Sequence, residues 1–315
     1  MKNKKKNLSL DTQLAAPKGK AAVERAAQAV FNACASFTIL AVAAITLYML
    51  LSGIPAILKV GFKEILFTTV WEPTAAQPKY GILYVILTSL LGTGLSVLIG
   101  VPVGVLAAVF LAEMAGKTAS VVRAAVELLA GIPSVIYGLL GIYLLNPAMY
   151  RLELKLFQGS GSHQFNGGSN LLSAVLVLAV MILPTVINIS EASIRAVDPG
   201  IRAASLALGG SRVQTIFKSV LPAARSGIVT AIVLGVGRAI GEAMAITLVS
   251  GGSVNAPLPF SSVRFLTTAI VSEMGYSTGT HRQMLFTIGL VLFGFIMLLN
   301  FALSNILKGE VAENG

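Results

Sequence analysis

Two charged residues four positions apart, Arg238 and Glu242, stand inside an apolar run from 228 to 249 that holds no other charge. In a helix that starts near Gly227, a rise of about 1.5 Å per residue places Arg238 roughly 16 Å along the axis. That is about the middle of a hydrocarbon core ~30 Å thick, where a charge costs at least ~2.5–3.5 kcal/mol. A cost of this size needs a partner or a pathway, so the pair predicts a membrane protein that handles an anion.

The rest of the sequence has the composition of an integral membrane protein. Apolar residues make up 55% of the chain and charged residues 11%, against about 25% charged in ordinary soluble domains. Several apolar runs exceed the ~18 residues that indicate a membrane helix, so we predict an all-α polytopic fold with about six transmembrane helices. The predicted spans are 31–51, 82–112, 128–149, 170–190, 228–250 and 284–307. The second is too long for one straight crossing, and Pro102 predicts a kink or a cytoplasmic extension there.

Charge placement predicts the orientation. With the N-terminus inside, the cytoplasmic segments carry 15 Lys or Arg and the opposite loops carry seven, which fits the positive-inside rule with both termini cytoplasmic. The net charge of +10 therefore reflects topology and attraction to the inner leaflet rather than nucleic-acid binding. Residues 1–30 are predicted to be a disordered basic tail, 31–307 the transmembrane domain and 308–315 a short cytoplasmic tail. A signal peptide is the alternative for the start, but the run 31–51 is longer than a signal core of ~7–15 residues.

Other chemistry is not indicated. Cys34 is the only cysteine, so neither an intramolecular disulfide nor a cysteine-based metal site can form. His163 and His281 fall in predicted outer loops without paired carboxylates, and we expect both to be solvated. Gly116-Lys117-Thr118 is like the end of a P-loop, but Leu111 stands where the motif requires glycine. We therefore expect no metal site, and we expect any ATP to be hydrolysed by another chain.

The longest predicted cytoplasmic segment, 191–226, contains the signals of a short capped helix. Asp198 is a good N-cap, and Pro199 suits the first helical position. The helix is predicted to run to Leu208 and to stop at Gly209, which tolerates a left-handed cap. One side of it carries small residues and suits insertion into a partner's groove, with a plain surface helix as the alternative. These small residues are Ala203, Ala204 and Ala207.

This segment resembles a known signature. The pattern Ala203-Ala204-Ser205-x3-Gly209-x9-Ser219-x-Leu221-Pro222 is similar to the cytoplasmic loop of ABC importer permeases, E-A-A-x3-G-x9-I-x-L-P. It departs from that signature at Ala203, Ser205 and Ser219.

Further segments resemble the permeases of phosphate-specific importers. They are Gly-Arg-Ala-Ile-Gly-Glu-Ala-Met-Ala at 237–245, Gly-Ile-Pro-Ser-Val-Ile-Tyr-Gly at 131–138, and Trp71-Glu72-Pro73 with Tyr80-Gly81. The resemblance covers roughly 60–307. On these motifs the chain is identified as similar to the PstC-type permease subunit of the phosphate-specific ABC importer.

The resemblance implies a type I ABC importer permease fold, in which helix 199–208 is the coupling helix that docks in an ATPase. It implies a core of this chain, a PstA-type permease and two ATP-binding subunits, supplied by an extracytoplasmic phosphate-binding protein. ATP and Mg would be bound by the ATPases, so this chain is expected to be a non-catalytic subunit without a cofactor, in the bacterial inner (plasma) membrane. The residues implied in ATPase coupling are Asp198, Arg202, Ala203, Ala204, Ser205, Gly209, Leu221 and Pro222.

Phosphate transport gives Arg238 and Glu242 specific expected roles. A guanidinium offers a fork of donors matched to the oxygens of hydrogen phosphate. At this spacing the two residues share a helix face, so Glu242 is predicted to pair with Arg238 until the anion replaces or shares it. The carboxylate also favours an anion that carries a proton over one that does not, such as sulfate. A structural ion pair between helices is the alternative.

The same span contains Gly237 and Gly241, a spacing that permits close helix approach. We expect it to serve either a permease–permease contact or ordinary packing. Because one arginine cannot neutralise a phosphate of charge about −1.5 to −2, a second arginine is expected from the partner permease.

Other interpretations stay open. A PstA-like subunit, or a permease for sulfate, molybdate or tungstate, would share the fold and the coupling loop, although the run Arg-Ala-Ile-Gly-Glu at 238–242 favours phosphate. A membrane sensor is disfavoured because the chain has no soluble signalling domain. A secondary transporter would show internal repeats, and the sequence has none that we find.

Overall fold

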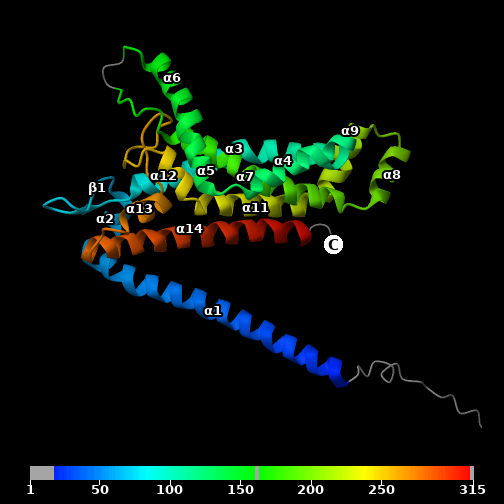
Figure 1. The fold of residues 1–315 in the computed structure, drawn as a ribbon, viewed down its shortest axis with the longest axis horizontal. Helices are drawn as coiled ribbons and strands as arrows, with labels where there is room; N and C mark the ends of the chain where they lie inside the picture. Colours follow the sequence, from blue (N-terminus) through cyan, green and yellow to red (C-terminus); the bar gives the residue numbers. More distant parts are fainter. Residues whose placement is uncertain (1–17, 160–162, 313–315) are drawn as a thin grey trace, which may run out of the picture. The chain divides into compact units, whose positions relative to one another are not determined.

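The computed structural model describes the backbone of residues 18–159 and 163–312, and the side chains of 23–116, 118–159 and 163–301 (Figure 1). The chain divides into two compact units, Met1–Leu51 and Ser52–Gly315. The described part of the first unit is helical and belongs to α1 (Lys18–Val60). The predicted disorder of residues 1–30 is therefore wrong for 18–30, where alanine-rich sequence favours helix. Residues 1–17 lie outside the described residues.

The second unit begins with the end of α1 and a short outer segment. This segment holds α2 (Phe62–Phe67) and an antiparallel hairpin of β1 (Trp71–Glu72) and β2 (Lys79–Tyr80), in which Trp71 pairs with Tyr80. The first half of the bundle consists of α3 (Leu83–Val109), η2 (Phe110–Met114), η3 (Gly116–Thr118), α4 (Ala119–Gly131), α5 (Ser134–Leu140), η4 (Gly141–Leu145), α6 (Asn146–Phe157) and α7 (Leu171–Arg195). The second half consists of α8 (Pro199–Ala207), α9 (Arg212–Thr215), η5 (Ile216–Val220), α10 (Leu221–Ala223), α11 (Arg225–Gly241), α12 (Met244–Val249), α13 (Leu266–Glu273) and α14 (Gly279–Ala312).

Five described helices are long and apolar enough to cross a membrane, and a sixth span results if the bent pair 212–223 and 225–241 counts as one. The all-α polytopic fold with about six spans is therefore confirmed. Several predicted boundaries differ; the first span, for example, covers Val23–Val60 rather than 31–51. Two of the differences have a clear cause. The third span begins at Ser134 rather than near 128, because Pro133 separates α4 from α5. The second span continues past Pro102 as one helix and then as the π-helical turn η2, so the element reaches Met114.

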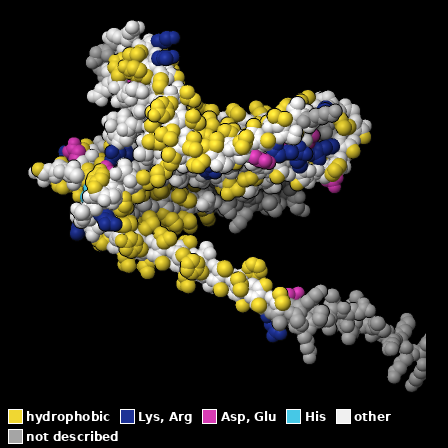
Figure 2. Space-filling model, viewed as in Figure 1, with side chains coloured by type: hydrophobic (Ala, Val, Ile, Leu, Met, Phe, Trp, Pro, Cys, Tyr) yellow, Lys and Arg dark blue, Asp and Glu magenta, His cyan; other side chains and the backbone are white. Residues whose placement is uncertain are grey.

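Helix α7 lies at the centre of the second unit and packs against α3 and α11. Glycines in α3 allow this approach: a Cβ at Gly100 would lie 2.7 Å from Ile182 Cδ1, and one at Gly104 would lie 2.8 Å from Val186 Cγ1. Figure 1 shows α8 and α9 at one end of this bundle, with α2, α12 and α13 at the other. Hydrophobic side chains cover most of its middle, and charged side chains lie mainly toward the two ends (Figure 2).

Candidate functional site

The fifth span is interrupted at Glu242. Helix α11 ends at Gly241, Glu242 is extended (φ −71°, ψ 131°), and α12 begins two residues later. The Glu242 carboxylate accepts the backbone N–H of Ala245 at 3.0 Å, and Thr267 Oγ1 donates to the Glu242 carbonyl at 2.7 Å. These two bonds satisfy the Ala245 N–H and the Glu242 carbonyl, two of the backbone groups at the break. The prediction of one continuous helix with Arg238 and Glu242 on a shared face is therefore wrong.

Arg238 lies in the last turn of α11 and is exposed on this single chain. Within the described side chains it forms no hydrogen bond or ion pair, including with Glu242. The carbonyl end of a helix carries partial negative charge, which lowers the cost of a cation at this position. At the break, the N–H donors of the Arg238 guanidinium are therefore accessible to an anion.

The glycines of α11 separate a packed side from an open side. A Cβ at Gly235 would lie 3.0 Å from Val186 of α7. At Gly237 and Gly241 a Cβ would meet nothing within 4 Å. Among the described residues, packing inside this chain therefore does not use the Gly237–Gly241 pair, whose neighbour Arg238 is also exposed.

The predicted helix in the cytoplasmic segment is present as α8, with the predicted caps. Asp198 Oδ1 accepts the N–H of Gly200 at 2.6 Å. Gly209 has φ +83°, and the Gly210 N–H donates to the Ser205 carbonyl at 3.1 Å, which closes the helix with a left-handed cap. No residue of α8 is buried. A groove of about 570 Å³ runs beside it, lined by Ile201, Ala204, Ser205, Leu208, Gln214 and Lys218.

The residues implied in coupling divide into outward and inward groups. Ala203, Ala204, Gly209 and Pro222 are exposed, and Leu221 packs partly against a small core between α3 and the loop. Two others turn inward, against expectation. The Ser205 hydroxyl bonds Thr215 at 2.9 Å. The Arg202 guanidinium bonds the Glu113 carboxylate at 2.8 and 3.0 Å, so its contact is with η2.

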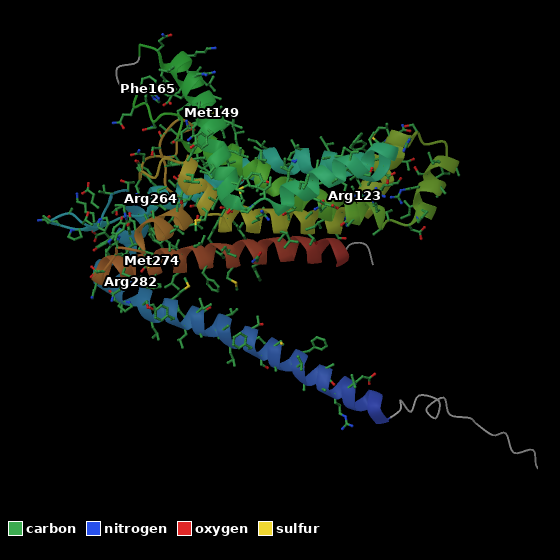
Figure 3. All side chains as sticks on the ribbon, in the orientation of Figure 1. Arg123, Met149, Phe165, Arg264, Met274 and Arg282 are labelled. Carbon is green, nitrogen blue, oxygen red and sulfur yellow. The ribbon has the colours of Figure 1, made fainter. Side chains whose placement is uncertain are left out.

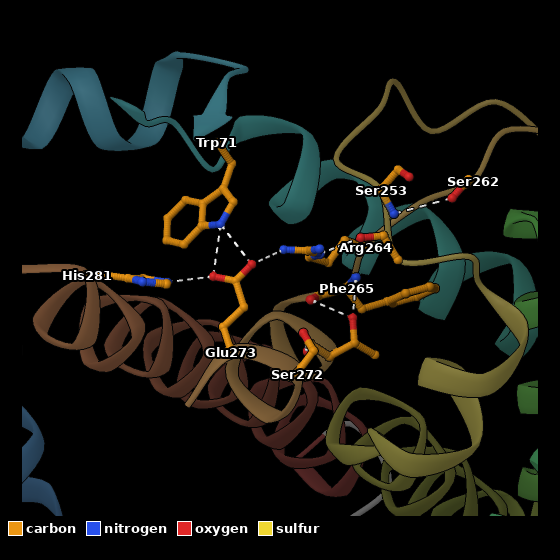
Figure 4. Close-up of polar contacts among 10 residues, drawn as sticks. Trp71, Ser253, Ser262, Arg264, Phe265, Ser272, Glu273 and His281 are labelled. Atoms are coloured by element: carbon orange, nitrogen blue, oxygen red, sulfur yellow. Dashed lines mark hydrogen bonds and ion pairs between the residues drawn. The ribbon is translucent and has the colours of Figure 1, made fainter. Parts of the chain in front are cut away.

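A buried polar cluster at the opposite end was missed from the sequence. The Glu273 cluster consists of Glu273, Trp71, Arg264 and His281 (Figure 4). The Trp71 indole N–H lies 3.1 and 3.2 Å from the two Glu273 oxygens, His281 Nε2 lies 2.7 Å from Oε2, and Arg264 also forms an ion pair with Glu273. His281 is 8% exposed, so the prediction that it is solvated is wrong. Trp71 is about two hundred positions away from Glu273, and no local pattern could have signalled this contact.

His163 is also paired rather than solvated. Its ring stacks on Phe157 at 4.0 Å, and its Nε2 lies 2.7 Å from the carboxylate of the buried Glu153. Within the described residues no group of three His, Cys, Asp or Glu side chains could hold a metal ion.

A helical membrane bundle with an exposed capped loop helix and an open cation beside a broken span has the features of a permease, the membrane subunit of a transporter. Comparison with known families specifies the class. The profile of binding-protein-dependent transport system inner membrane components matches residues 100–309. The chain belongs to this family.

Similar proteins cover nearly the whole chain. A probable ABC transporter permease, YqgH of Bacillus subtilis, is 37% identical over 96% of this chain and 98% of its own length. The phosphate transport system permease protein PstC of Haemophilus influenzae is 32% identical over 79% of this chain and 85% of its own. A chain of a bacterial alginate ABC transporter shares the fold, with a TM-score of 0.61 at 18% identity over 89% of this chain and 95% of that one. The chain is thus a multi-pass permease subunit of an ABC importer, similar to PstC.

Proposed function

We propose that this chain is the PstC-type subunit of an ATP-driven phosphate importer. The observation that carries the proposal is Arg238, which is exposed and has no partner among the described side chains. It lies in an apolar span of a chain that is similar to a phosphate permease. A guanidinium at this depth of the membrane is costly unless a negatively charged group neutralises it. A transported oxyanion is the match that its planar fork of donors fits.

The open side of α11 supports pairing with a second, PstA-type permease. Gly237 and Gly241 leave room there for close approach of another helix. The second permease then contributes another arginine to the shared path, so that two cations neutralise one phosphate. Two ATPases hold ATP and Mg, and one of them docks on α8. An extracytoplasmic phosphate-binding protein delivers the ligand to the opposite end. Both termini are cytoplasmic, in the bacterial inner membrane.

Glu242 supports selection among oxyanions. One of its oxygens accepts the Ala245 N–H. The other oxygen is then available to accept the O–H of hydrogen phosphate beside Arg238. Sulfate has no proton to donate at neutral pH and is repelled by the same carboxylate. The pair thus acts through the ligand rather than through direct contact with each other.

The test is uptake of radiolabelled phosphate by the complex reconstituted from both permeases, the ATPase and the binding protein. We expect phosphate and arsenate to compete and sulfate not to compete. Arg238→Gln should reduce uptake by about 100-fold, as does removal of a charge-stabilising donor in other sites, at equal assembly. The matched control is Arg282→Gln, which removes an exposed arginine at the N-terminal end of α14 (Figure 3).

Uptake near the wild-type value in Arg238→Gln would contradict the role of this residue. If the complex took up sulfate, molybdate or tungstate instead of phosphate, this would favour the second candidate, a permease for another oxyanion. Assembly of this chain with a separate PstC as its partner permease would favour a PstA-like subunit.

A further inference from the structure

Arginines from three elements converge on the turn η2 at the end of α3. In this π-helical turn the Ala115 N–H donates to the Phe110 carbonyl at 2.8 Å, so the Leu111 carbonyl loses its usual α-helical donor. Arg195 at the end of α7 takes its place and donates to Leu111 O at 3.0 Å. The unusual turn is therefore held by a guanidinium from the start of the coupling segment.

Glu113 in the same turn receives the other two. Arg202 of α8 donates to the Glu113 carboxylate at 2.8 and 3.0 Å, and Arg212 of α9 donates to the Glu113 carbonyl. Arg202 also donates to Val197 O at 2.6 Å and to Ile194 O at 2.7 Å. We call Glu113, Arg195, Arg202 and Arg212 the η2 clamp.

The η2 clamp is more than a surface ion pair. The side chains of Glu113 and Arg202 are 14% and 24% exposed, so solvent screens them only in part. A guanidinium that donates four hydrogen bonds has one geometry, unlike an exposed pair of flexible side chains. The contact spans 89 positions in the sequence and connects α8 to a different helix from those that flank it in the chain.

Helix α3 carries this contact into the membrane. Its glycine face packs closely on α7 at Gly100 and Gly104, and α7 packs in turn on α11 at Gly235. A displacement of α3 is therefore transmitted through α7 to α11, the helix that carries Arg238. The contacts are close at each step, and close-packed helices transmit strain.

We propose that Glu113 and Arg202 are positioning residues that make α8 and α3 move as one body, so that ATPase movement reaches the span of Arg238 through α3. This inference rests on the proposed function, since it concerns the coupling of that transport to ATP hydrolysis. It assigns Arg202 to an internal contact rather than to the ATPase surface.

The first test measures phosphate transported per ATP hydrolysed in the reconstituted complex. Glu113→Gln keeps the size of the side chain and removes its charge. We expect ATP hydrolysis to persist and the transport ratio to fall about fivefold, the effect of losing a charge-assisted contact on an equilibrium. Glu127→Gln is the matched control, because Glu127 is an exposed carboxylate on the neighbouring α4. An unchanged ratio in Glu113→Gln would overturn the proposal.

The second test does not depend on the stability of a charge variant. In a Cys34→Ala background, Glu113→Cys and Arg202→Cys are joined by a short bifunctional thiol reagent. If the two helices move as one body, the crosslinked complex keeps its transport ratio, and the uncrosslinked double variant loses it. Loss of transport on crosslinking would show that α8 must move relative to α3, and would overturn the proposal.

The two proposals can fail separately. A wild-type complex that does not transport phosphate contradicts the proposed function. A wild-type complex that transports phosphate, with the same transport ratio in Glu113→Gln, contradicts only the role of the η2 clamp.

Discussion

The chain contains two glycine pairs at the same four-residue spacing, Gly100 with Gly104 in α3 and Gly237 with Gly241 in α11. The first pair is used inside the chain, since a Cβ at either position would collide with Ile182 or Val186 of α7. The second pair faces open space. The same sequence pattern thus has two outcomes, and only the partner helix decides between them.

The difference separates what holds this subunit together from what it offers to others. The α3–α7 seam contains no charged residue at its glycines and is complete within one chain. The open side of α11 carries Arg238 between its two glycines, a cation that no side chain in the described part of the chain pairs. If two permeases share one path, each subunit alone should hold only part of the anion site, as the open side of α11 does. Each of the following variants tests one side of this comparison.

The largest effect is expected in the seam. Gly100→Ala would place a Cβ 2.7 Å from Ile182 Cδ1 and 2.9 Å from the Ala179 carbonyl, a backbone atom that cannot rotate away. Overpacking of this kind costs ~1–3 kcal/mol, which thermal unfolding of the purified complex in detergent would measure. Gly94→Ala is the control on the same helix, because a Cβ there meets nothing within 4 Å. Equal destabilisation by both variants would show that the seam is not close-packed.

On the open side, Arg238→Lys tests the fork of donors separately from the charge. Lysine keeps the charge but offers a point of donation rather than a planar pair. We expect phosphate uptake to fall about tenfold, equivalent to ~1.4 kcal/mol, with unfolding temperature unchanged. Uptake equal to that of the wild type would mean that charge alone suffices.

Gly237→Ala should have a smaller effect, and on assembly rather than on folding. The added methyl group meets no described atom of this chain within 4 Å, so the stability of the chain should change by less than about 0.5 kcal/mol. Co-purification with the second permease should fall severalfold, since the helix can no longer approach as closely. Unchanged co-purification would remove Gly237 from the proposed contact.

The smallest effect on uptake is expected from an arginine that already forms an ion pair. Arg123 of α4 donates to Glu191 at 2.5 Å, and this hydrogen bond, followed by the charge of Glu191, raises the pKa of its guanidinium. A raised pKa on a basic group gives stability that is complete at neutral pH and is lost only in strong alkali. Arg123→Gln should therefore leave uptake unchanged from about pH 6 to pH 8, measured beside Arg238→Gln. A loss as large as that of Arg238→Gln would contradict the distinction between matched and unmatched arginines.

The features that depend on neighbouring residues could be predicted from the sequence. Long apolar runs predict the spans, and Asp198 and Gly209 predict both ends of α8, because caps form within one turn. The break at Glu242 could not be predicted. Gly241 directly precedes the break, but glycines at this spacing in an apolar run are equally typical of a continuous, closely packed membrane helix. The break is held by Thr267, which lies 25 positions further along. The inward direction of Arg202 likewise depends on Glu113 in another helix.

One consequence of the Glu273 cluster is practical. Trp71 is the only tryptophan in the chain, and its indole N–H is bound to Glu273 at the end opposite α8. The tryptophan fluorescence of this subunit, excited selectively over that of its seven tyrosines, therefore arises from a single known position. In a complex with partners that lack tryptophan, changes in Trp71 emission could be followed in real time without any attached dye. Quenching would then report when a delivered ligand reaches that end of the molecule.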